Sequence, residues 1–224
     1  MRRLQDYQKI RVAIAWIRRN QRWQARRAHL QSKAYLHAGC GPQIAAGFVN
    51  LDYRWVPGVD VVWDLARPLP FPAGRFQGIF TEHCLEHFDE TGLQAILGEF
   101  LRVLRPGGRI RIVVPSLEIH ARRYLAALGR PAGEDAVSPA RAINRVFYSG
   151  HDWMKRSHWN NDGHHFMHDA ASLDSCLQSA GFHEIRPVSF GQGADPRLLI
   201  DRQDRAWESL YMEACKPAAG RATP

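Results

Sequence analysis

The sequence predicts a single α/β domain built on a mostly parallel sheet, and three features of the chain indicate this fold class. Short apolar runs of strand length recur through the first half of the chain, and several are followed by a glycine or an acidic residue. A longer segment with apolar residues at helical spacing lies between the earlier runs and a later one. Strands that alternate with helices form parallel sheets, and 224 residues suit one domain with a sizeable core.

The expected elements follow in order along the chain. Five strands are expected in the first half, at residues 34–38, 48–52, 59–63, 76–81 and 108–114. The helix expected at 89–104 carries apolar residues at spacings of three and four, and the Pro106-Gly107-Gly108 sequence ends it. A second helix is expected at 171–180, and two late strands, at 183–189 and 208–215, bring the number of strands to seven.

Two glycines separated by one residue, Gly39 and Gly41, follow the first expected strand. Without a Cβ atom, glycine lets the backbone approach a ligand closely at the end of a strand. Asp52 ends the second strand and Asp64 follows the third, where carboxylates can accept hydrogen bonds from a ribose diol and from an exocyclic amine. A glycine pair alone is typical of a tight turn, but the ordered set indicates a nucleoside-binding site.

The link between the first two strands is short. Only eleven positions separate Gly41 from Asp52, whereas a parallel crossover usually takes a dozen or more residues. We therefore expect the first crossover helix to be reduced to a turn or absent, which weakens the contribution of a helix N-terminus to anion binding.

Further motifs extend this pattern over most of the chain. LPFP lies at 69–72, FQGIFTEHCLEH at 76–87 and LRVLRPGGRIRIVVP at 101–115. Together with the glycine pair, these segments resemble the class I S-adenosylmethionine-dependent methyltransferases. The tail, with DPRL at 195–198 and ESLYMEACKP at 208–217, resembles a bacterial subgroup whose members often appear among polysaccharide-biosynthesis genes.

The resemblance implies a seven-stranded Rossmann-like sheet with helices on both faces and a last strand that runs antiparallel between the fifth and the sixth. It implies S-adenosylmethionine as the cofactor, with Asp52 at the ribose and Asp64 and Leu65 beside the adenine; a loop cap is the alternative for Asp64. His37 stands where the superfamily usually has an acid, and Gln43 where it often has a third glycine. The expected cofactor-binding residues are His37, Ala38, Gly39, Cys40, Gly41, Asp52, Tyr53, Asp64, Leu65, Glu82, His83 and His87.

The segment at about 116–170 is longer than one crossover helix requires, and we expect it to form a substrate lid. Its aromatic, amide and histidine side chains suit a hydroxylated, sugar-like acceptor. The expected substrate-binding residues are Tyr124, Tyr148, Trp153 and His164, and the candidate bases are His83, His151 and His165. The alternative is a packed polar lid whose histidines satisfy backbone groups; for Glu86 and His87 it is an ion pair at a helix entry.

Metal chemistry and cysteine catalysis are not expected. Five histidines lie within residues 151–168, but their spacing matches no structural zinc pattern, and adjacent His164 and His165 would project in divergent directions. Cys84 follows a histidine rather than a proline and has no implied basic partner. The four cysteines show no paired spacing, which suits a reducing compartment, and no apolar run approaches the length of a membrane span.

Residues 1–33 form a basic arm with ten basic residues and one acidic residue, whereas residues 34–224 carry 20 basic and 21 acidic residues. Apolar residues at spacings of three and four predict that the arm begins as an amphipathic helix; they are Leu4, Tyr7, Ile10, Ile14 and Ile17. Three roles stay open: a helix docked by this stripe, a helix on an anionic membrane surface with Trp16 and Trp23 as anchors, or an RNA contact.

We therefore expect an arm (1–33), a methyltransferase domain (34–217) and a flexible tail (218–224). The expected activity is transfer of a methyl group from S-adenosylmethionine to a small-molecule or carbohydrate-linked acceptor, with oxygen as the favoured atom. The expected location is the cytoplasm, with peripheral attachment to the inner membrane through residues 1–30 as an option, and nucleic acid is a less favoured partner. The alternatives are an RNA methyltransferase that uses the arm and a non-catalytic cofactor-binding partner in glycan assembly.

Overall fold

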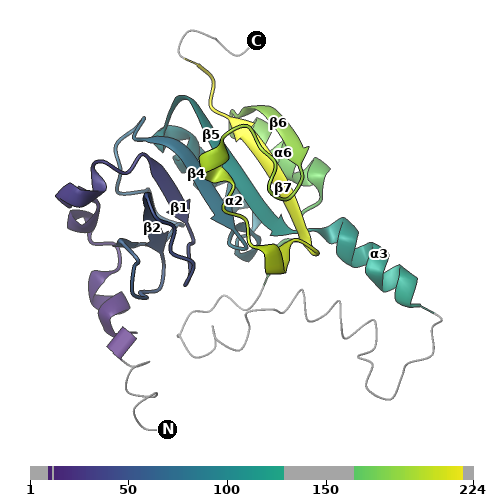
Figure 1. The fold of residues 1–224 in the computed structure, drawn as a ribbon, viewed down its shortest axis with the longest axis horizontal. Coiled ribbons are helices and arrows are strands. Elements are labelled where there is room, and N and C mark those ends of the chain that lie inside the picture. Colours follow the sequence, from purple (N-terminus) through teal and green to yellow (C-terminus); the bar gives the residue numbers. More distant parts are fainter. Residues whose placement is uncertain (1–9, 12, 129–163, 219–224) are drawn as a thin grey trace.

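The computed structural model describes residues 10–11, 13–128 and 164–218. They form a seven-stranded sheet in the order β3-β2-β1-β4-β5-β7-β6 (Figure 1). The pairs among β1 to β5 are parallel, and β7 is antiparallel to both β5 and β6. The predicted fold class, including the antiparallel last strand between the fifth and the sixth, is confirmed.

The strands are β1 (Tyr35–Ala38), β2 (Phe48–Asp52), β3 (Val61–Val62), β4 (Phe76–Glu82), β5 (Leu104–Pro115), β6 (His183–Val188) and β7 (Ser209–Cys215). Two of them differ from the expected boundaries by more than one residue. β3 is only two residues long. β5 begins at Leu104 rather than at residue 108, because Leu104 pairs with Phe76 before an irregularity in the register.

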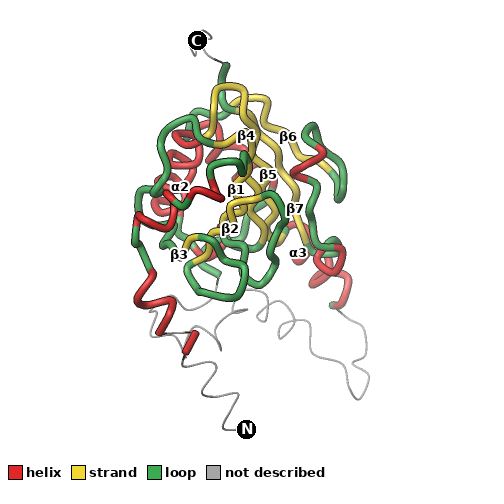
Figure 2. Tube along the Cα trace, turned by 60° about the vertical axis from the view of Figure 1, so that its left-hand side comes forward, coloured by secondary structure: helices red, strands yellow, loops and turns green. Residues whose placement is uncertain are grey.

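One face of the sheet is covered by α2 (Glu90–Val103) and α6 (Ala170–Ser179), which contact each other, and Figure 2 shows α2 on this side of the strands. Asp89 caps α2 by accepting a hydrogen bond from Gly92 N at 2.7 Å, and Asp169 and Ser172 form a capping box on α6. The apolar sides of both helices join the main core, which includes Leu36, Leu51, Ile79, Ile112, Leu97 and Leu173.

The other face is covered differently. In the described part of the chain, the segment between β6 and β7 packs on this face, where the resemblance implied helices, and it contains two short 3-10 helices, η5 (Pro196–Leu198) and η6 (Gln203–Arg205). Arg111 on β5 is fully buried and donates to Asp201 at 2.6 and 2.7 Å and to Glu213 at 3.2 Å. This ion-pair network fastens the segment to the sheet, which matters because η6 reaches the strand ends.

Two further features bear on the site. Between β1 and β2 the chain makes turns without a helix, as the short spacing predicted. α3 (Leu117–Ala127) follows β5 directly, and Figures 1 and 2 show it projecting away from the sheet. No helix in the described part of the chain combines the length and apolar character that a bilayer crossing requires.

The arm packs against the β3 edge, but not through the predicted stripe. Residues 13–18 are helical, and Ala15 is buried against an apolar cluster around Val59. Ile10 and Ile17 are 56% and 65% exposed, so these two residues of the stripe do not dock the arm on the domain, which was one of the three roles left open. Arg11 and Arg18 flank Ala15 on the docking side instead, because their guanidiniums donate to backbone carbonyls at 3.4 and 3.5 Å; the first nine residues lie outside the described part.

Candidate active site

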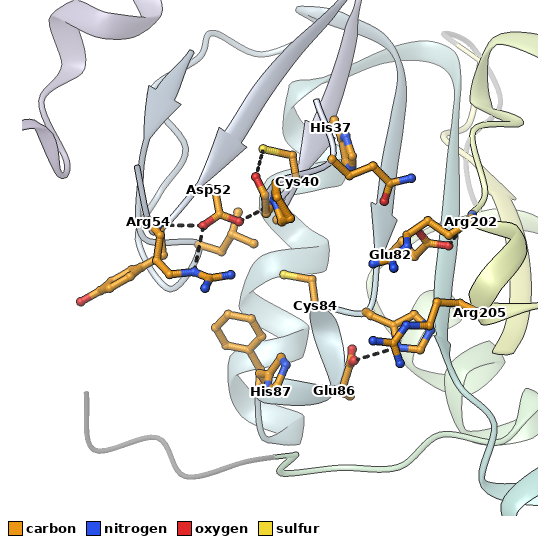
Figure 3. Close-up of a pocket in the computed structure, with 18 of the residues that line it drawn as sticks. His37, Cys40, Asp52, Arg54, Glu82, Cys84, Glu86, His87, Arg202 and Arg205 are labelled. Carbon is orange, nitrogen blue, oxygen red and sulfur yellow. Dashed lines mark hydrogen bonds and ion pairs between the residues drawn. The ribbon is translucent and has the colours of Figure 1, made fainter. Parts of the chain in front are cut away.

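A cavity of about 440 Å³ opens at the carboxyl ends of β1, β2 and β4 (Figure 3), the edge at which parallel sheets bind ligands. The lining residues are His37, Gly39, Cys40, Gly41, Pro42, Gln43, Asp52, Tyr53, Arg54, Trp63, Leu65, Glu82, His83, Cys84, Glu86, His87, Phe88, His164, Arg202 and Arg205. All the expected cofactor-binding residues except Ala38 and Asp64 are among them. The structure thus gathers residues from the three strand ends, from η3 (Leu85–His87) and from η6.

Gly39 and Gly41 have positive φ angles of +70° and +52°, but glycine is needed at each for a different reason. A Cβ atom at Gly39 would lie 2.3 Å from the Sγ atom of Cys84, so the turn after β1 and the turn after β4 pack against each other there. A Cβ atom at Gly41 would meet nothing within 4 Å. Gly39 therefore fixes the shape of the cavity, and Gly41 leaves the backbone open to a ligand.

Asp52 ends β2 with its carboxylate buried and held in place. Its Oδ2 accepts a hydrogen bond from Gly41 N and its Oδ1 from Arg54 N, each at 2.7 Å. Burial raises the pKa of Asp52, while the Arg54 charge and the two backbone N–H groups oppose this shift. Each carboxylate oxygen has a second lone pair, so both can also accept a hydrogen bond from a ribose hydroxyl.

The β3 side of the cavity is aromatic and apolar, with Tyr53, Trp63 and Leu65 in its wall. Such a wall suits the faces of a purine ring. Asp64 does not line the cavity, and its Oδ1 accepts a hydrogen bond from Ala66 N at 3.0 Å. This is the loop-cap geometry that we set against the adenine role.

At the end of β4 lies a buried carboxyl group, that of Glu82, of which only one oxygen accepts a hydrogen bond from the described residues. Glu82 Oε1 accepts a hydrogen bond from Arg202 N at 3.0 Å, and Oε2 has no hydrogen-bond partner among the described residues. Burial raises the pKa of Glu82 to about 7. Arg202 and Arg205 line the same end of the cavity, so it presents both acidic and basic groups.

His37 is almost fully buried beside these groups, at 1% exposure. Its ring meets Phe80 nearly edge-on at a centroid distance of 5.1 Å, and burial lowers the pKa of His37 to about 4. The imidazole is therefore neutral near pH 7, and it does not supply the negative charge that the superfamily usually places at this position.

His83 follows β4 with a φ angle of +48°, which is unusual for a residue other than glycine. Its Nε2 atom lies 2.9 Å from Ser209 Oγ, and that hydroxyl donates to Arg205 O at 2.8 Å. Because a serine hydroxyl has one hydrogen, Nε2 of His83 must be the donor and Nδ1 carries a lone pair. Burial lowers the pKa of His83 to about 3, so this candidate base is neutral and a weak proton acceptor.

Glu86 and His87 lie on η3, close to His164 from a distant segment. Glu86 is 1% exposed and accepts no side-chain hydrogen bond from the described residues; burial raises its pKa to about 8. His83 Nδ1 and His164 Nε2 lie 3.6 and 3.7 Å from its Oε1 atom. Glu86, His87 and His164 can each direct one ligand atom to a common point, with these atoms within 4.8 Å of one another.

The expected acceptor-side residues are only partly placed. His164 lines the cavity, whereas Tyr124 lies on α3 and outside the lining. His165 is exposed and contributes its backbone N–H, which donates to Glu86 O at 2.8 Å, rather than its imidazole. Tyr148, His151 and Trp153 lie outside the described residues.

Several cavity residues were not found from the sequence. They include Arg54, Trp63, Phe88, Arg202 and Arg205. Arg205 of η6 and Arg202 just before it could have been suspected because the DPRL and ESLY motifs flank them. Burial raises the pKa of the Cys40 and Cys84 thiols, which keeps both protonated and gives no support to cysteine catalysis.

Comparison with known proteins gives the family. A family model described as a methyltransferase domain matches residues 10–185, and no curated protein matches significantly. A solved S-adenosylmethionine-dependent methyltransferase from Methanosarcina mazei is 14% identical, with 84% of this chain and 94% of that chain covered and a TM-score of 0.48.

Two other matched structures contain the cofactor or its product. The 1,6-didemethyltoxoflavin-N1-methyltransferase of Burkholderia thailandensis, with bound S-adenosylhomocysteine, is 19% identical over 85% of this chain and 74% of that chain, with a TM-score of 0.44. Phosphoethanolamine N-methyltransferase 2 of Haemonchus contortus, in complex with S-adenosylmethionine, is 13% identical over 86% of this chain, with a TM-score of 0.45, and the chain spans 51% of its length. The family match covers most of the chain, from the arm to β6. The chain therefore belongs to the methyltransferase-domain family and is an S-adenosylmethionine-dependent methyltransferase.

Proposed function

We propose that this enzyme methylates a small-molecule or carbohydrate-linked acceptor at oxygen. The observation that carries the proposal is the composition of the cavity, in which the Gly41–Asp52 cradle shares one space with a polar wall of histidine, glutamate and arginine side chains. A polar wall of this kind favours a hydroxylated acceptor. S-adenosylmethionine supplies a methyl group that is already activated, so the protein has to position the acceptor and exclude water.

The cavity residues fit the cofactor from one end to the other. Asp52 would accept the ribose hydroxyls, and the wall at Trp63 and Leu65 would contact the adenine. At the methionine end we assign the ammonium group to the unbonded Oε2 of Glu82 and the carboxylate to Arg202, since each offers the complementary charge. Glu82 would thus replace the acid that the chain lacks at His37.

Transfer of a labelled methyl group tests this function. The purified chain is incubated with methyl-labelled S-adenosylmethionine and three acceptor sets: small hydroxylated compounds, oligosaccharides and RNA. We expect label in one of the first two sets, in a product stable to the mild base that cleaves methyl esters. Label only in RNA, or none in any set, would contradict the proposal.

A charge variant separates the RNA alternative more cleanly than deletion of the arm. Deletion would remove Gln24 and Leu30, which are buried in the fold, whereas Arg22 and Arg26 are exposed. The double variant Arg22→Gln/Arg26→Gln should retain turnover on a soluble acceptor. An enzyme that acts on RNA would lose activity in this variant, and its affinity for RNA would depend less steeply on salt concentration.

We also propose that the arm contacts an anionic membrane surface. Trp16, Ile17 and Trp23 are 76%, 65% and 54% exposed on it, interspersed with arginines, a combination typical of interfacial helices. We expect the wild-type chain to sediment with phosphatidylglycerol vesicles and not with neutral vesicles. High salt and the double variant Trp16→Ser/Trp23→Ser should each abolish this sedimentation. Equal sedimentation of the variant would contradict the contact.

A further inference from the structure

We propose that Glu86, His87 and His164 bind a divalent transition-metal ion, such as Zn²⁺, inside the cavity and beside the cofactor site. The proposal rests on the function proposed above, because the ion would hold an oxygen of the acceptor. Histidine spacing in the sequence did not indicate this set, since two of its three ligands come from the turn after β4. His164 is the single member from the histidine-rich segment.

The geometry of the three side chains suits one ion. Their ligand atoms lie within 4.8 Å of one another, and Glu86 Oε1 lies 3.7 Å from His164 Nε2. Two ligands of a tetrahedral ion with bonds of about 2.0–2.1 Å lie about 3.3 Å apart. Small side-chain rotations would bring the three atoms around one ion, and Figure 3 shows Glu86 and His87 side by side on the turn below Cys84.

A second observation points to a cation at this place. The Glu86 carboxyl is 1% exposed and lines the cavity, yet neither oxygen accepts a hydrogen bond from the described residues. His83 turns Nδ1 toward it at 3.6 Å, and the Ser209 contact requires that nitrogen to carry a lone pair. Both oxygens of this buried carboxyl thus lack a partner among the described residues, which is unfavourable unless a bound group completes them.

The backbone holds the third ligand in position. The N–H groups of His165 and Phe166 donate to Glu86 O at 2.8 and 3.2 Å. These two bonds tie the segment that carries His164 to η3, across a long stretch of sequence. The juxtaposition of His164 with Glu86 is thus built into the backbone and does not depend on side-chain contacts alone.

The donor set indicates the kind of ion and its use. Two imidazoles and one carboxylate are a ligand set of catalytic zinc sites, in which a fourth position stays open for water or substrate. Here the open position would face the cavity that also contains Gly41 and Asp52. A hydroxylated acceptor bound through its oxygen would be held next to the cofactor, and a metal-bound oxygen ligand ionises more readily than a free one.

Metal titration of the full chain tests this site without reference to activity. The protein is freed of metal with a chelator and titrated with Co²⁺, followed by visible absorption, and with Zn²⁺ by calorimetry. We expect one saturable equivalent, with affinity lowered about tenfold or more in Glu86→Gln and in His164→Ala. His165→Ala is the matched control, since its exposed imidazole lies outside the cavity lining, and it should bind like the wild type.

Far-UV circular dichroism and thermal midpoints without metal identify variants that fold, and His87→Ala replaces any that does not. Absence of a saturable equivalent in the wild type, or unchanged affinity in the folded variants, would overturn the metal site. Titration of the metal-free protein with S-adenosylhomocysteine separates the two proposals. If the protein binds S-adenosylhomocysteine but no metal ion, the metal site alone is overturned. If it binds a metal ion but no S-adenosylhomocysteine, the proposed function is contradicted.

Discussion

Two buried carboxylates line the same cavity with opposite hydrogen bonding. Asp52 accepts backbone N–H groups from Gly41 and Arg54, each at 2.7 Å, whereas neither oxygen of Glu86 accepts a hydrogen bond from the described residues. The β1–β2 side of the cavity is therefore organised before a ligand arrives. The β4 side keeps polar groups that a ligand must complete, and Glu82 Oε2 belongs to it as well.

The difference follows from how each side is built. Asp52 is served by backbone groups within eleven residues of it, so local sequence determines its partners. Glu86 lies near His164 and within the electrostatic influence of Arg205 on η6, and long-range packing brings both to it. The first side therefore suits the constant part of a reaction, the cofactor, and the second suits a variable acceptor.

The largest expected effect comes from the contact between the two sides. Gly39→Ala would place a Cβ atom 2.3 Å from Cys84 Sγ at a φ of +70°. We expect the free energy of unfolding to fall by about 4 kcal/mol, from overpacking together with left-handed strain. Chemical denaturation measures this change.

Gly41→Ala is its matched control, because it has the same kind of strain but nothing within 4 Å of the new Cβ atom. It should cost about 1 kcal/mol of stability. Adding Cys84→Gly to Gly39→Ala should restore part of the loss. Equal destabilisation by the two alanine variants would show that the sides do not pack as described.

The next effect concerns Glu82 on the β4 side of the cavity and depends on pH. Glu82 has a pKa of about 7 in the folded chain against an ordinary value of 4.5, so the folded state binds the proton more tightly. The tighter binding of this proton stabilises the folded state fully below pH 4.5, and this stabilisation is lost as the pH rises through 7. Between pH 4.5 and 8, wild-type stability should fall relative to Glu82→Gln by up to about 3 kcal/mol.

Urea denaturation of both proteins across this pH range is the measurement. Glu118→Gln, an exposed carboxylate on α3 paired with Arg122, should show a difference from the wild type that stays nearly constant with pH. A parallel pH dependence of wild type and Glu82→Gln would mean that Glu82 is not desolvated in the folded chain.

The smallest of the three effects concerns Asp52 on the β1–β2 side of the cavity. Asp52→Ala should weaken binding of S-adenosylhomocysteine by about 1–3 kcal/mol, because the ribose hydroxyls and the N–H group of Gly41 lose their acceptor. Asp64→Ala, which removes a loop cap outside the cavity, should leave the affinity within about twofold. Calorimetry with equal losses in both variants would remove the distinction between the two aspartates.

Much of this arrangement could be predicted from the sequence, because strand order and the cofactor edge follow local patterns. β1, β2 and β4 lie close to their expected positions, and Gly41 with Asp52 meets as the glycine and acid pattern indicated. These contacts join the ends of neighbouring strands, and the glycine and acidic residues at those ends can be recognised in the sequence.

The rest depends on packing that local patterns do not encode. Arg202 reaches the cavity because Arg111 fastens the preceding segment to the far face of the sheet through Asp201. The arm docks through Ala15, which packs on an apolar cluster, and through Arg11 and Arg18, whose partners are carbonyls of the domain. Hydrophobic periodicity cannot reveal the two arginine contacts. Glu86 and His164 are joined by backbone bonds across a long separation.

Calorimetric titration of the purified wild-type chain with S-adenosylhomocysteine tests the central claim most directly. With the Gly41–Asp52 edge as the binding site, we predict saturable uptake of one equivalent, weakened in Asp52→Ala and retained in Asp64→Ala. Absence of saturable uptake by a folded wild-type chain would contradict the account.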